Sequence, residues 1–522
     1  MNVRLMHPDR DFVPPQEMPR RAEYRDRNRL PQTLSSHEQA MTQDLELDTL
    51  LRAMAADDEF LLDVARRSLL MGLHNDAGTI LYRQEVLKDC MKNPAVVREF
   101  YDVVVEAIDS KMERRLGVFS SRPSGVLREA IDLVEMFVEM LKKLREMADA
   151  HVGRFESRGF KALFAMLQRE FSDDYFARIQ NHVTELKFRG GVLLSAELGE
   201  GNESTRYVLR QARRKKVNWL KRLLGKRPAA YTFSIDPRDE GGARILSEMR
   251  ERGINLVADA LAQSADHILG FFKALKTELA FYVACLNLRD KLAPMGTPIC
   301  FPQPEGAGTR KHHFAGLCDV SLALTMGRNV VGNDLNADGR SLVIITGANQ
   351  GGKSTFLRSV GLAQLMMQCG MFVAAESFTA EICTGLFTHY KREEDATMKS
   401  GKLDEELGRM SGIADAVAPN SMLLFNESFA STNEREGSEI ARQIVCALLE
   451  RRAKVFFVTH LYDFAHSLHD RKADDAIFLR AERRDDGTRT FRLVEGEPLE
   501  TSYGEDLYSE IFAAETEELS AG

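Results

Sequence analysis

The sequence predicts two kinds of structure in one chain: a mainly α-helical part with a small β-containing insertion, followed by an α/β domain. Apolar residues recur every three or four positions over 126–147, and this periodicity changes near residue 186. From about residue 299, short apolar runs alternate with helical segments. The first spacing lines up one face of a helix, whereas alternating strands and helices indicate a mainly parallel sheet.

Within the first part, we expect an extended or disordered arm over residues 1–44 and a helical core or lever domain over 45–298. The arm holds many charges and prolines and lacks apolar periodicity, which disfavours packed elements. Helical patterning in the domain resumes from about residue 239 to 292. The stripe within 126–147 is more typical of core than of a binding surface, and comprises Leu127, Ile131, Val134, Phe137, Leu141 and Leu144.

A small β-containing insertion is predicted inside the helical domain, at about residues 186–237. The segment LKFRGGVLLSAELG alternates and breaks at Gly190-Gly191, which is typical of a hairpin or of paired strands. Residues 231–236 predict a further strand that stops at Pro237. Between these strands, residues 206–227 contain ten Lys or Arg and no Asp or Glu.

The composition excludes several classes of protein. The 522 residues are 44% hydrophobic and 28% charged, and their net charge is −8, which fits a soluble globular protein and not a uniformly basic nucleic-acid coat. None of the seven cysteines forms a CxxC pair, so neither a zinc ribbon nor a disulfide scaffold is predicted, and a cytoplasmic location is expected. No signal peptide and no membrane span are expected, because long apolar runs are lacking.

The strongest motif of the 299–522 segment is a glycine-rich loop between the predicted strand SLVIIT and a helical pattern. It matches G-x-x-x-x-G-K-[ST], in which Lys353 is expected to reach the β- and γ-phosphates of a nucleotide and Ser354 to bind Mg²⁺. Glycines let backbone N–H groups wrap a phosphate, and the helix N-terminus adds positive charge. The predicted nucleotide-binding residues here are Gly347, Ala348, Asn349, Gln350, Gly351, Gly352, Lys353, Ser354 and Thr355.

The rest of such a site is predicted at the ends of two further buried strands, because ligands bind at the carboxyl ends of parallel strands. The run SMLLF is followed by Asn426, expected beside Mg²⁺, and by Glu427, expected to orient or deprotonate the attacking water. The run VFFV is followed by Thr459 and His460. His460 is expected to sense the γ-phosphate, with an ordinary strand-end histidine as the alternative. Lys353, Glu427 and His460 are the predicted catalytic residues.

These motifs resemble those of the MutS family of DNA mismatch-repair proteins, within the ABC-type ATPases. TGANQGGKST at 346–355 is similar to the family's TGPNMGGKST, and VGNDL at 331–335 is similar to its VPND segment. GMFVAAES at 370–377 resembles its GxFVPAE segment, and His460 matches the histidine of its ATH switch. The resemblance covers roughly residues 310–470. It implies an ABC-type P-loop ATPase domain over 299–522 that uses ATP and Mg²⁺.

Three departures from the family pattern bear on function. Asn426 stands where the family has Asp, so weaker Mg²⁺ binding or slower hydrolysis is expected. The signature that acts on the partner subunit's nucleotide is replaced by KSGKLDEE, in which Ser400 and Gly401 are the expected donors to a γ-phosphate. Phe137-Val-Glu139 matches the letters of the family's Phe-x-Glu mismatch wedge, but it lies on the helical stripe and is expected to be core. The mismatch-reading domain is therefore expected to be absent.

The basic insertion allows three interpretations. In the first it binds DNA, because the family's DNA clamp is also an insertion in the helical lever. Basic side chains neutralise phosphates and an aromatic ring stacks on a base, and the residues concerned are Arg213, Arg214, Lys215, Lys216, Trp219, Lys221 and Arg222. The second is a solvated charge run anchored by Trp219. The third is an amphipathic helix against an acidic partner or a membrane surface.

With this resemblance, the sequence predicts a MutS-like ATPase that acts in DNA mismatch repair or in related repair or recombination. ATP is expected to bind between the ATPase domains of a homodimer, and closure is expected to act through the helical lever on a DNA clamp. One alternative is a nucleotide-gated binding protein with negligible hydrolysis, in which Asn426 leaves ATP bound as a switch. The other is an ABC-type ATPase whose lever holds a protein partner.

Overall fold

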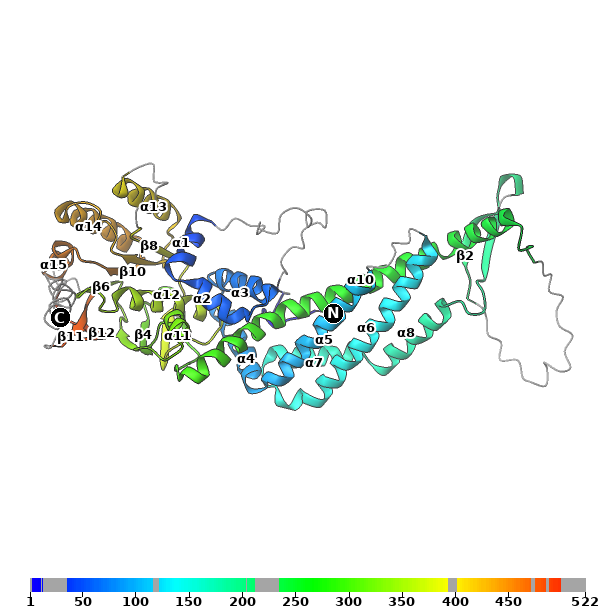
Figure 1. Ribbon diagram of the computed structural model, residues 1–522, viewed down its shortest axis with the longest axis horizontal. Helices are drawn as coiled ribbons and strands as arrows, with labels where there is room; N and C mark the ends of the chain where they lie inside the picture. The colour runs from blue at the N-terminus through cyan, green and yellow to red at the C-terminus, as the bar shows by residue number, and fades with distance from the viewer. Residues whose placement is uncertain are drawn as a thin grey trace, which may run out of the picture. The chain divides into compact units, whose positions relative to one another are not determined.

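The structure is a computed structural model, and its described chain forms two compact units (Figure 1). One unit comprises Met1–Val3, Arg98–Phe155 and Lys161–Lys276, and the other comprises Arg4–Val97, Glu156–Phe160 and Thr277–Gly522. The predicted domain boundaries, at residues 44, 186, 237 and 298, stay predictions. The structure describes residues 2–10, 12, 35–115, 122–202, 204–211, 234–392, 401–470, 475–484 and 488–498.

The first unit is built mainly from long helices. Its helices are α5 (Pro94–Arg115), α6 (Pro123–His151), α7 (Arg158–Glu170), α8 (Asp173–Leu186) and α10 (Glu240–Leu292), with the 3-10 turn η1 (Val152–Arg154) after α6; α5, α7 and α10 extend beyond the unit. The predicted stripe over 126–147 lies within α6 and is buried. Its Phe137 packs against Phe272 of α10, with the ring centroids 5.4 Å apart. No described helix has both the length and the apolar character that crossing a membrane demands.

The described part of the predicted insertion contains one strand pair. β1 (Leu194–Leu198) pairs antiparallel with β2 (Ser204–Leu209). The turn between them contains η2 (Glu200–Asn202) and Gly201, whose φ of +72° suits a reversal, so the hairpin does not turn at Gly190-Gly191 as predicted. That glycine pair instead follows α8, where Gly191 N donates to Phe188 O at 2.9 Å. Of the predicted strand at 231–236, residues 234–236 are described and belong to no strand.

The second unit combines helices with two sheets. Its helices are α1 (Ser36–Asp44), α2 (Leu47–Ala55), α3 (Glu59–Gly72), α4 (Ala77–Lys92), η3 (Ala293–Met295), α11 (Val320–Met326), α12 (Lys353–Cys369), α13 (Lys402–Ala416), α14 (Glu434–Glu450) and α15 (Tyr462–Asp470). Its strands are β3 (Gln303–Glu305), β4 (His312–Leu317), β5 (Asn333–Asn336), β6 (Leu342–Thr346), β7 (Ser377–Glu381), β8 (Leu386–Tyr390), β9 (Met422–Asn426), β10 (Lys454–Val458), β11 (Ala476–Arg483) and β12 (Arg489–Glu495).

The larger sheet has the strand order β12-β11-β6-β10-β9-β8. All of its pairs are parallel except β11 with β12, so the α/β alternation predicted after residue 299 is present. Residues of one face, such as Leu423, Phe425 and Phe457, form a core with buried side chains of α13, α14 and α15. Helix α12 contacts β9 and β10 as well. The smaller sheet has the order β3-β7-β4-β5.

The first residues of the predicted arm are held by buried side chains of the second unit. Glu278 on α10 is fully buried and accepts from the backbone N–H groups of Leu5, Met6 and Phe12 at 2.5, 3.0 and 2.9 Å. Arg83 on α4 donates to Met6 O at 2.9 Å. A buried carboxylate is tolerated only when such donors satisfy it. Residues 36–44 of the predicted arm form α1.

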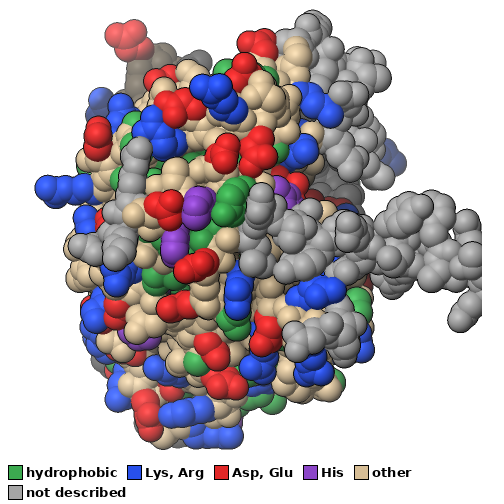
Figure 2. Space-filling model, turned by 90° about the vertical axis from the view of Figure 1, so that its left-hand side faces the viewer, with side chains coloured by type: hydrophobic (Ala, Val, Ile, Leu, Met, Phe, Trp, Pro, Cys, Tyr) green, Lys and Arg blue, Asp and Glu red, His purple; other side chains and the backbone are tan. Residues whose placement is uncertain are grey.

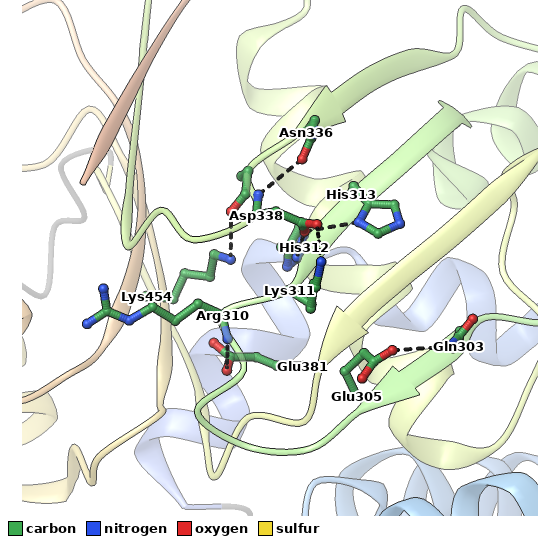
Figure 3. Close-up of polar contacts among 11 residues, drawn as sticks. Gln303, Glu305, Arg310, Lys311, His312, His313, Asn336, Asp338, Glu381 and Lys454 are labelled. Atoms are coloured by element: carbon green, nitrogen blue, oxygen red, sulfur yellow. Dashed lines mark hydrogen bonds and ion pairs between the residues drawn. The ribbon is translucent and has the colours of Figure 1, made fainter. Parts of the chain in front are cut away.

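A buried histidine lies near the start of β10, at the opposite end of the strand from His460. Figure 3 shows His312 beside Asp338 and Lys454. The His312 ring is fully buried among Phe314, Phe378 and Phe456, and neither of its nitrogens has a hydrogen-bond partner. Burial, and secondarily Lys454, hold the pKa of His312 well below its usual value, although Asp338 opposes the shift.

Acidification is therefore expected to destabilise the protein through His312. In the unfolded chain this histidine becomes protonated below pH ~6.5, whereas the folded state resists protonation. As the pH falls below that value, the free energy of unfolding decreases by up to about 1.4 kcal/mol per pH unit. Urea denaturation at about pH 7 and pH 5.5 measures this loss. His312→Phe should shrink it by roughly 1.4 kcal/mol. The solvent-exposed His267→Gln serves as the control, and an equal loss in wild type and His312→Phe contradicts the prediction.

Candidate nucleotide-binding site

The glycine-rich loop connects β6 to α12 and has a backbone that other residues cannot readily adopt. Gly347 has a φ of +110°, and a Cβ there would lie 2.8 Å from Ala481 N on β11. Gly352, the N-cap of α12, has a φ of +90°. Only glycine takes such angles without strain and admits so close a neighbour. The loop therefore leaves the first N–H groups of α12 available to an anion.

The side chain of Lys353 turns back and contacts the glycine-rich loop that precedes it. Its Nζ donates to Gly347 O and Ala348 O at 2.8 Å each, and the residue is only 5% exposed. Burial lowers the pKa of Lys353 to about 8, while Glu427 opposes and Arg489 adds to the shift. An anion in the loop stabilises the charged ammonium, which makes this lysine a suitable partner for phosphate.

Two oxygen-bearing side chains meet at the carboxyl ends of β6 and β9. Ser354 Oγ, in the first turn of α12, donates to Asn426 Oδ1 at 3.0 Å. Asn426 is the last residue of β9, which runs parallel to β10, and β10 in turn pairs with β6. The parallel register therefore brings together two residues that are 72 positions apart. Hydroxyl and amide oxygens are ligands, direct or through water, that Mg²⁺ accepts.

Glu427 and His460 form the second polar pair. His460 Nε2 lies 3.0 Å from Glu427 Oε1, and this hydrogen bond is the main cause that lowers the pKa of Glu427, against the opposing effect of burial. Glu427 adopts a φ of +54°, a left-handed conformation that non-glycine residues rarely take and that clusters at functional sites. The carboxylate is thus ionised at neutral pH and held in one orientation.

Residues 349–355 of the loop and the start of α12, together with Glu427, line one cleft of about 550 Å³, whereas Gly347, Ala348 and Asn426 do not line it. Sequence reasoning missed most of its other wall. Phe491 on β12 lines the cleft, and its carbonyl accepts from Asn333 Nδ2 at 3.3 Å. The further lining residues include Asp319, Leu322, Met326, Arg328, Asn329, Val330, Val331, Phe356 and Ser359. In this wall, only the VGNDL stretch at 331–335 was indicated by a sequence motif. No local pattern in the sequence predicts that Phe491 lines the cleft.

A buried network behind Glu427 was also missed. His389 on β8 is 1% exposed, its Nδ1 lies 2.8 Å from Ser428 Oγ, and its Nε2 lies 3.0 Å from Glu406 O on α13. Burial lowers the pKa of His389 to about 4. Glu406 accepts from Phe429 N at 3.1 Å, and Phe429 takes a φ of +64°. The network fixes the turn that presents Glu427, and no spacing in the sequence predicts it.

Several predicted residues do not enter this cleft. Gly401 is the exposed N-cap of α13 and is not among the cleft-lining residues of its own chain. Ser400 lies outside the described residues. The same holds for the whole predicted DNA-binding set, which is Arg213, Arg214, Lys215, Lys216, Trp219, Lys221 and Arg222. His460 touches the cleft only through Glu427.

Comparison with known proteins gives two family matches. The model described as MutS2 N-terminal domain matches residues 75–295, and the model described as MutS domain V matches residues 343–514. MutS protein homolog 4 of Mus musculus is 26% identical over 256 residues, which are 48% of this chain and 25% of the relative. DNA mismatch repair protein MutS of Streptococcus mutans is 27% identical over 270 residues, which are 50% of this chain and 31% of the relative.

The fold and the site define an α/β protein with a glycine-rich loop at the carboxyl edge of a largely parallel sheet. The two matched models follow one another along the chain, one over the helices and one over the larger sheet. The chain belongs to the MutS family, as the motifs predicted. The matched segments span only about a quarter to a third of these relatives, 25% and 31%.

Proposed function

We propose that this protein binds and hydrolyses ATP through an ABC-type P-loop domain over residues 299–522. The observation that carries the proposal is the hydrogen bond from Ser354 to Asn426 at 3.0 Å, because Ser354 lines the same cleft as Lys353 and Glu427. A phosphate-binding loop, a metal-type oxygen pair and an ionised carboxylate are the parts that phosphoryl transfer to water needs. Membership of the MutS family supports this reading, since the family consists of ATPases.

The side chains present suit ATP and Mg²⁺. Ser354 and Asn426 would hold the metal through oxygen atoms, and the N–H groups of the loop would hold the phosphates. The metal ion, when bound, supplies positive charge that neutralises phosphate oxygens. Phe491 offers an aromatic wall on which a base can stack.

Each polar group then has a defined task in hydrolysis. Lys353 stabilises negative charge on the β- and γ-phosphates. Glu427 accepts a hydrogen bond from the attacking water and takes its proton, and His460 holds the Glu427 carboxylate through Nε2. Ser400 and Gly401 are proposed to contact the γ-phosphate in the partner subunit of a homodimer, which the exposed position of Gly401 permits.

We propose DNA as the macromolecular partner. The printed names of relatives refer to DNA mismatch repair, and that role in repair or recombination is proposed here for a chain that matches only part of each relative. Nucleotide-driven closure would act through the helices of the first unit on DNA held near the basic insertion. ATPase activity with and without duplex, mismatched and branched DNA tests this function. Absence of any ATP turnover, together with absence of DNA binding, would overturn it.

Asn426 favours a form of this function in which ATP is hydrolysed slowly and stays bound as a switch. Its side chain is a neutral amide, whereas an aspartate at this position would add negative charge beside the metal ion. Asn426→Asp is expected to raise turnover at limiting Mg²⁺, because the added charge strengthens metal binding. Steady-state ATPase rates across a Mg²⁺ series measure the effect. If Asn426 only weakens metal affinity, the difference vanishes at saturating Mg²⁺; if it slows hydrolysis itself, the difference persists. No acceleration at any Mg²⁺ concentration would remove Asn426 from the metal site.

The basic insertion is expected to set the salt dependence of DNA binding. Replacing Arg213, Arg214, Lys215 and Lys216 by Ala should flatten the slope of log affinity against log salt, by roughly 0.9 for each lost phosphate contact on duplex DNA. Fluorescence anisotropy over a salt series measures the slope. Replacing Lys142 and Lys143, two neighbouring lysines on the solvent side of α6, tests for a general charge effect. An unchanged slope would assign the run to a solvated surface or to another partner.

A further inference from the structure

The last turn of α15 carries two imidazoles and a carboxylate that ATP hydrolysis does not use. His466, His469 and Asp470 stand at positions i, i+3 and i+4, which an α-helix places on one face. Among the residues that the structure describes, they form the one group of at least three His, Cys, Asp or Glu side chains arranged to share a metal ion.

The ligand atoms are already near the spacing that a tetrahedral ion needs. One ring nitrogen of each histidine and an Asp470 oxygen lie within 4.8 Å of one another. His466 Nε2 is 3.2 Å from Asp470 Oδ2, and His469 Nδ1 is 3.9 Å from Asp470 Oδ1. Bonds of about 2.0–2.1 Å in a tetrahedral site separate neighbouring ligand atoms by roughly 3.3 Å. The His466–Asp470 separation is already close to this value, and the other separations, which are at most 4.8 Å, must shorten on binding.

Neighbouring aromatic rings restrain both imidazoles. The His466 ring stacks on Tyr462, with the centroids 5.0 Å apart and an interplanar angle of 12°. The His469 ring meets Phe478 of β11 edge-on, at 5.1 Å and 84°. Side chains that neighbouring residues already hold in place lose less conformational entropy when they bind a metal ion. The helix C-terminus also favours a cation, because unpaired carbonyls of the last turn carry partial negative charge.

Solvent can reach this group. The side chains of His466, His469 and Asp470 are 45%, 32% and 61% exposed. Figure 2 faces the side on which α15 lies in Figure 1, and it shows histidine side chains close to acidic ones on that face. An ion can therefore enter without local unfolding, and water can complete its coordination.

We propose that His466, His469 and Asp470 form a binding site for a divalent transition-metal ion of the Zn²⁺ class. Imidazole nitrogens suit Zn²⁺, Co²⁺ and Ni²⁺ and do not suit Mg²⁺, so this site is chemically distinct from the one beside Ser354. The ion cross-links the last turn of α15. That helix begins two residues after His460, and its first amides, Tyr462 N and Asp463 N, donate to Glu434 Oε1 of α14 at 2.9 and 3.4 Å. Metal binding would thus rigidify α15, the helix that follows His460 in the chain.

The test uses the full-length chain without a polyhistidine tag, under reducing conditions and without nucleotide. Co²⁺ titration followed by visible absorption should show one ion per chain, with bands of nitrogen and oxygen ligation, and Zn²⁺ should displace it. His466→Ala and Asp470→Asn should each raise the Kd at least about tenfold, since one of three protein ligands is lost. Zn²⁺ should raise the Tm of wild type and not of these variants, because a ligand that binds the folded state stabilises it.

His460→Ala is the matched control, because it removes an imidazole that is also paired with a carboxylate but lies beside the nucleotide cleft. It should leave Co²⁺ affinity unchanged. Three results would overturn the proposal: no Co²⁺ uptake, uptake that His466→Ala and Asp470→Asn do not weaken, or uptake that is lost in His460→Ala. A sulfur-to-metal charge-transfer band would also overturn it, because it would place the ion at a cysteine.

Discussion

Lys353→Ala is expected to abolish tight ATP binding. Lys353 is 5% exposed, and its ammonium donates to two backbone carbonyls of the loop, so it already lies beside the place where phosphate oxygens are expected. Losing charge-assisted hydrogen bonds to phosphate in so buried a place costs at least about 2 kcal/mol, or roughly 30-fold in Kd. Isothermal titration with ATP and Mg²⁺ measures this loss directly.

Lys454→Met provides a matched control for Lys353→Ala. Lys454 is also 5% exposed, and burial lowers its pKa to about 8 as it does for Lys353. It lies at the first position of β10, whereas the cleft lies at the carboxyl ends of the strands. Its replacement should alter stability and leave ATP affinity intact. ATP affinity that survives in Lys353→Ala, or that falls equally in Lys454→Met, would contradict the role of the loop.

Local patterns predicted β6, β10 and β9, which are neighbours in the larger sheet, because each of these strands is marked within a few residues. SLVIIT, SMLLF and VFFV are short apolar runs bounded by polar residues, and they form β6, β9 and β10. Their buried position on both faces explains why they are continuously apolar. The hairpin of β1 and β2 was misplaced because two glycine-containing turns compete there, and only packing chooses between them.

The site was predictable where residues lie at strand ends and unpredictable where distant segments meet. Asn426, Glu427 and Ser354 follow from the parallel register, since carboxyl ends of adjacent strands share one edge. Phe491 reaches the cleft from an antiparallel edge strand, and His389 reaches Ser428 through the core. Long-range contacts of this kind leave no periodic trace. The hydrogen bonds from the backbone N–H groups of Leu5 and Met6 to Glu278 could not be predicted for the same reason.

Glu427→Gln is expected to keep ATP binding and to remove hydrolysis. Its carboxylate is ionised at neutral pH, and the His460 hydrogen bond lowers the pKa of Glu427 further below its usual value. A glutamine of the same shape cannot accept a proton from water, and loss of a general base costs about 10²–10⁴-fold in rate. Single-turnover hydrolysis measures the chemical step separately from product release.

The same variant separates a water-positioning role from a phosphate-binding role. Lys353 and Glu427 both line the cleft, and Lys353 supplies the positive charge that binds phosphate. ATP affinity should therefore change little in Glu427→Gln, whereas it should fall strongly in Lys353→Ala. If ATP closes two ATPase domains on one another, Glu427→Gln should accumulate as an ATP-bound dimer, visible by light scattering. Glu434→Gln, which alters a nearby acid that caps α15, controls for a general loss of charge and should keep turnover. Hydrolysis by Glu427→Gln at the wild-type rate would show that another group activates the water, and Glu427 would then be left with the task of orienting His460.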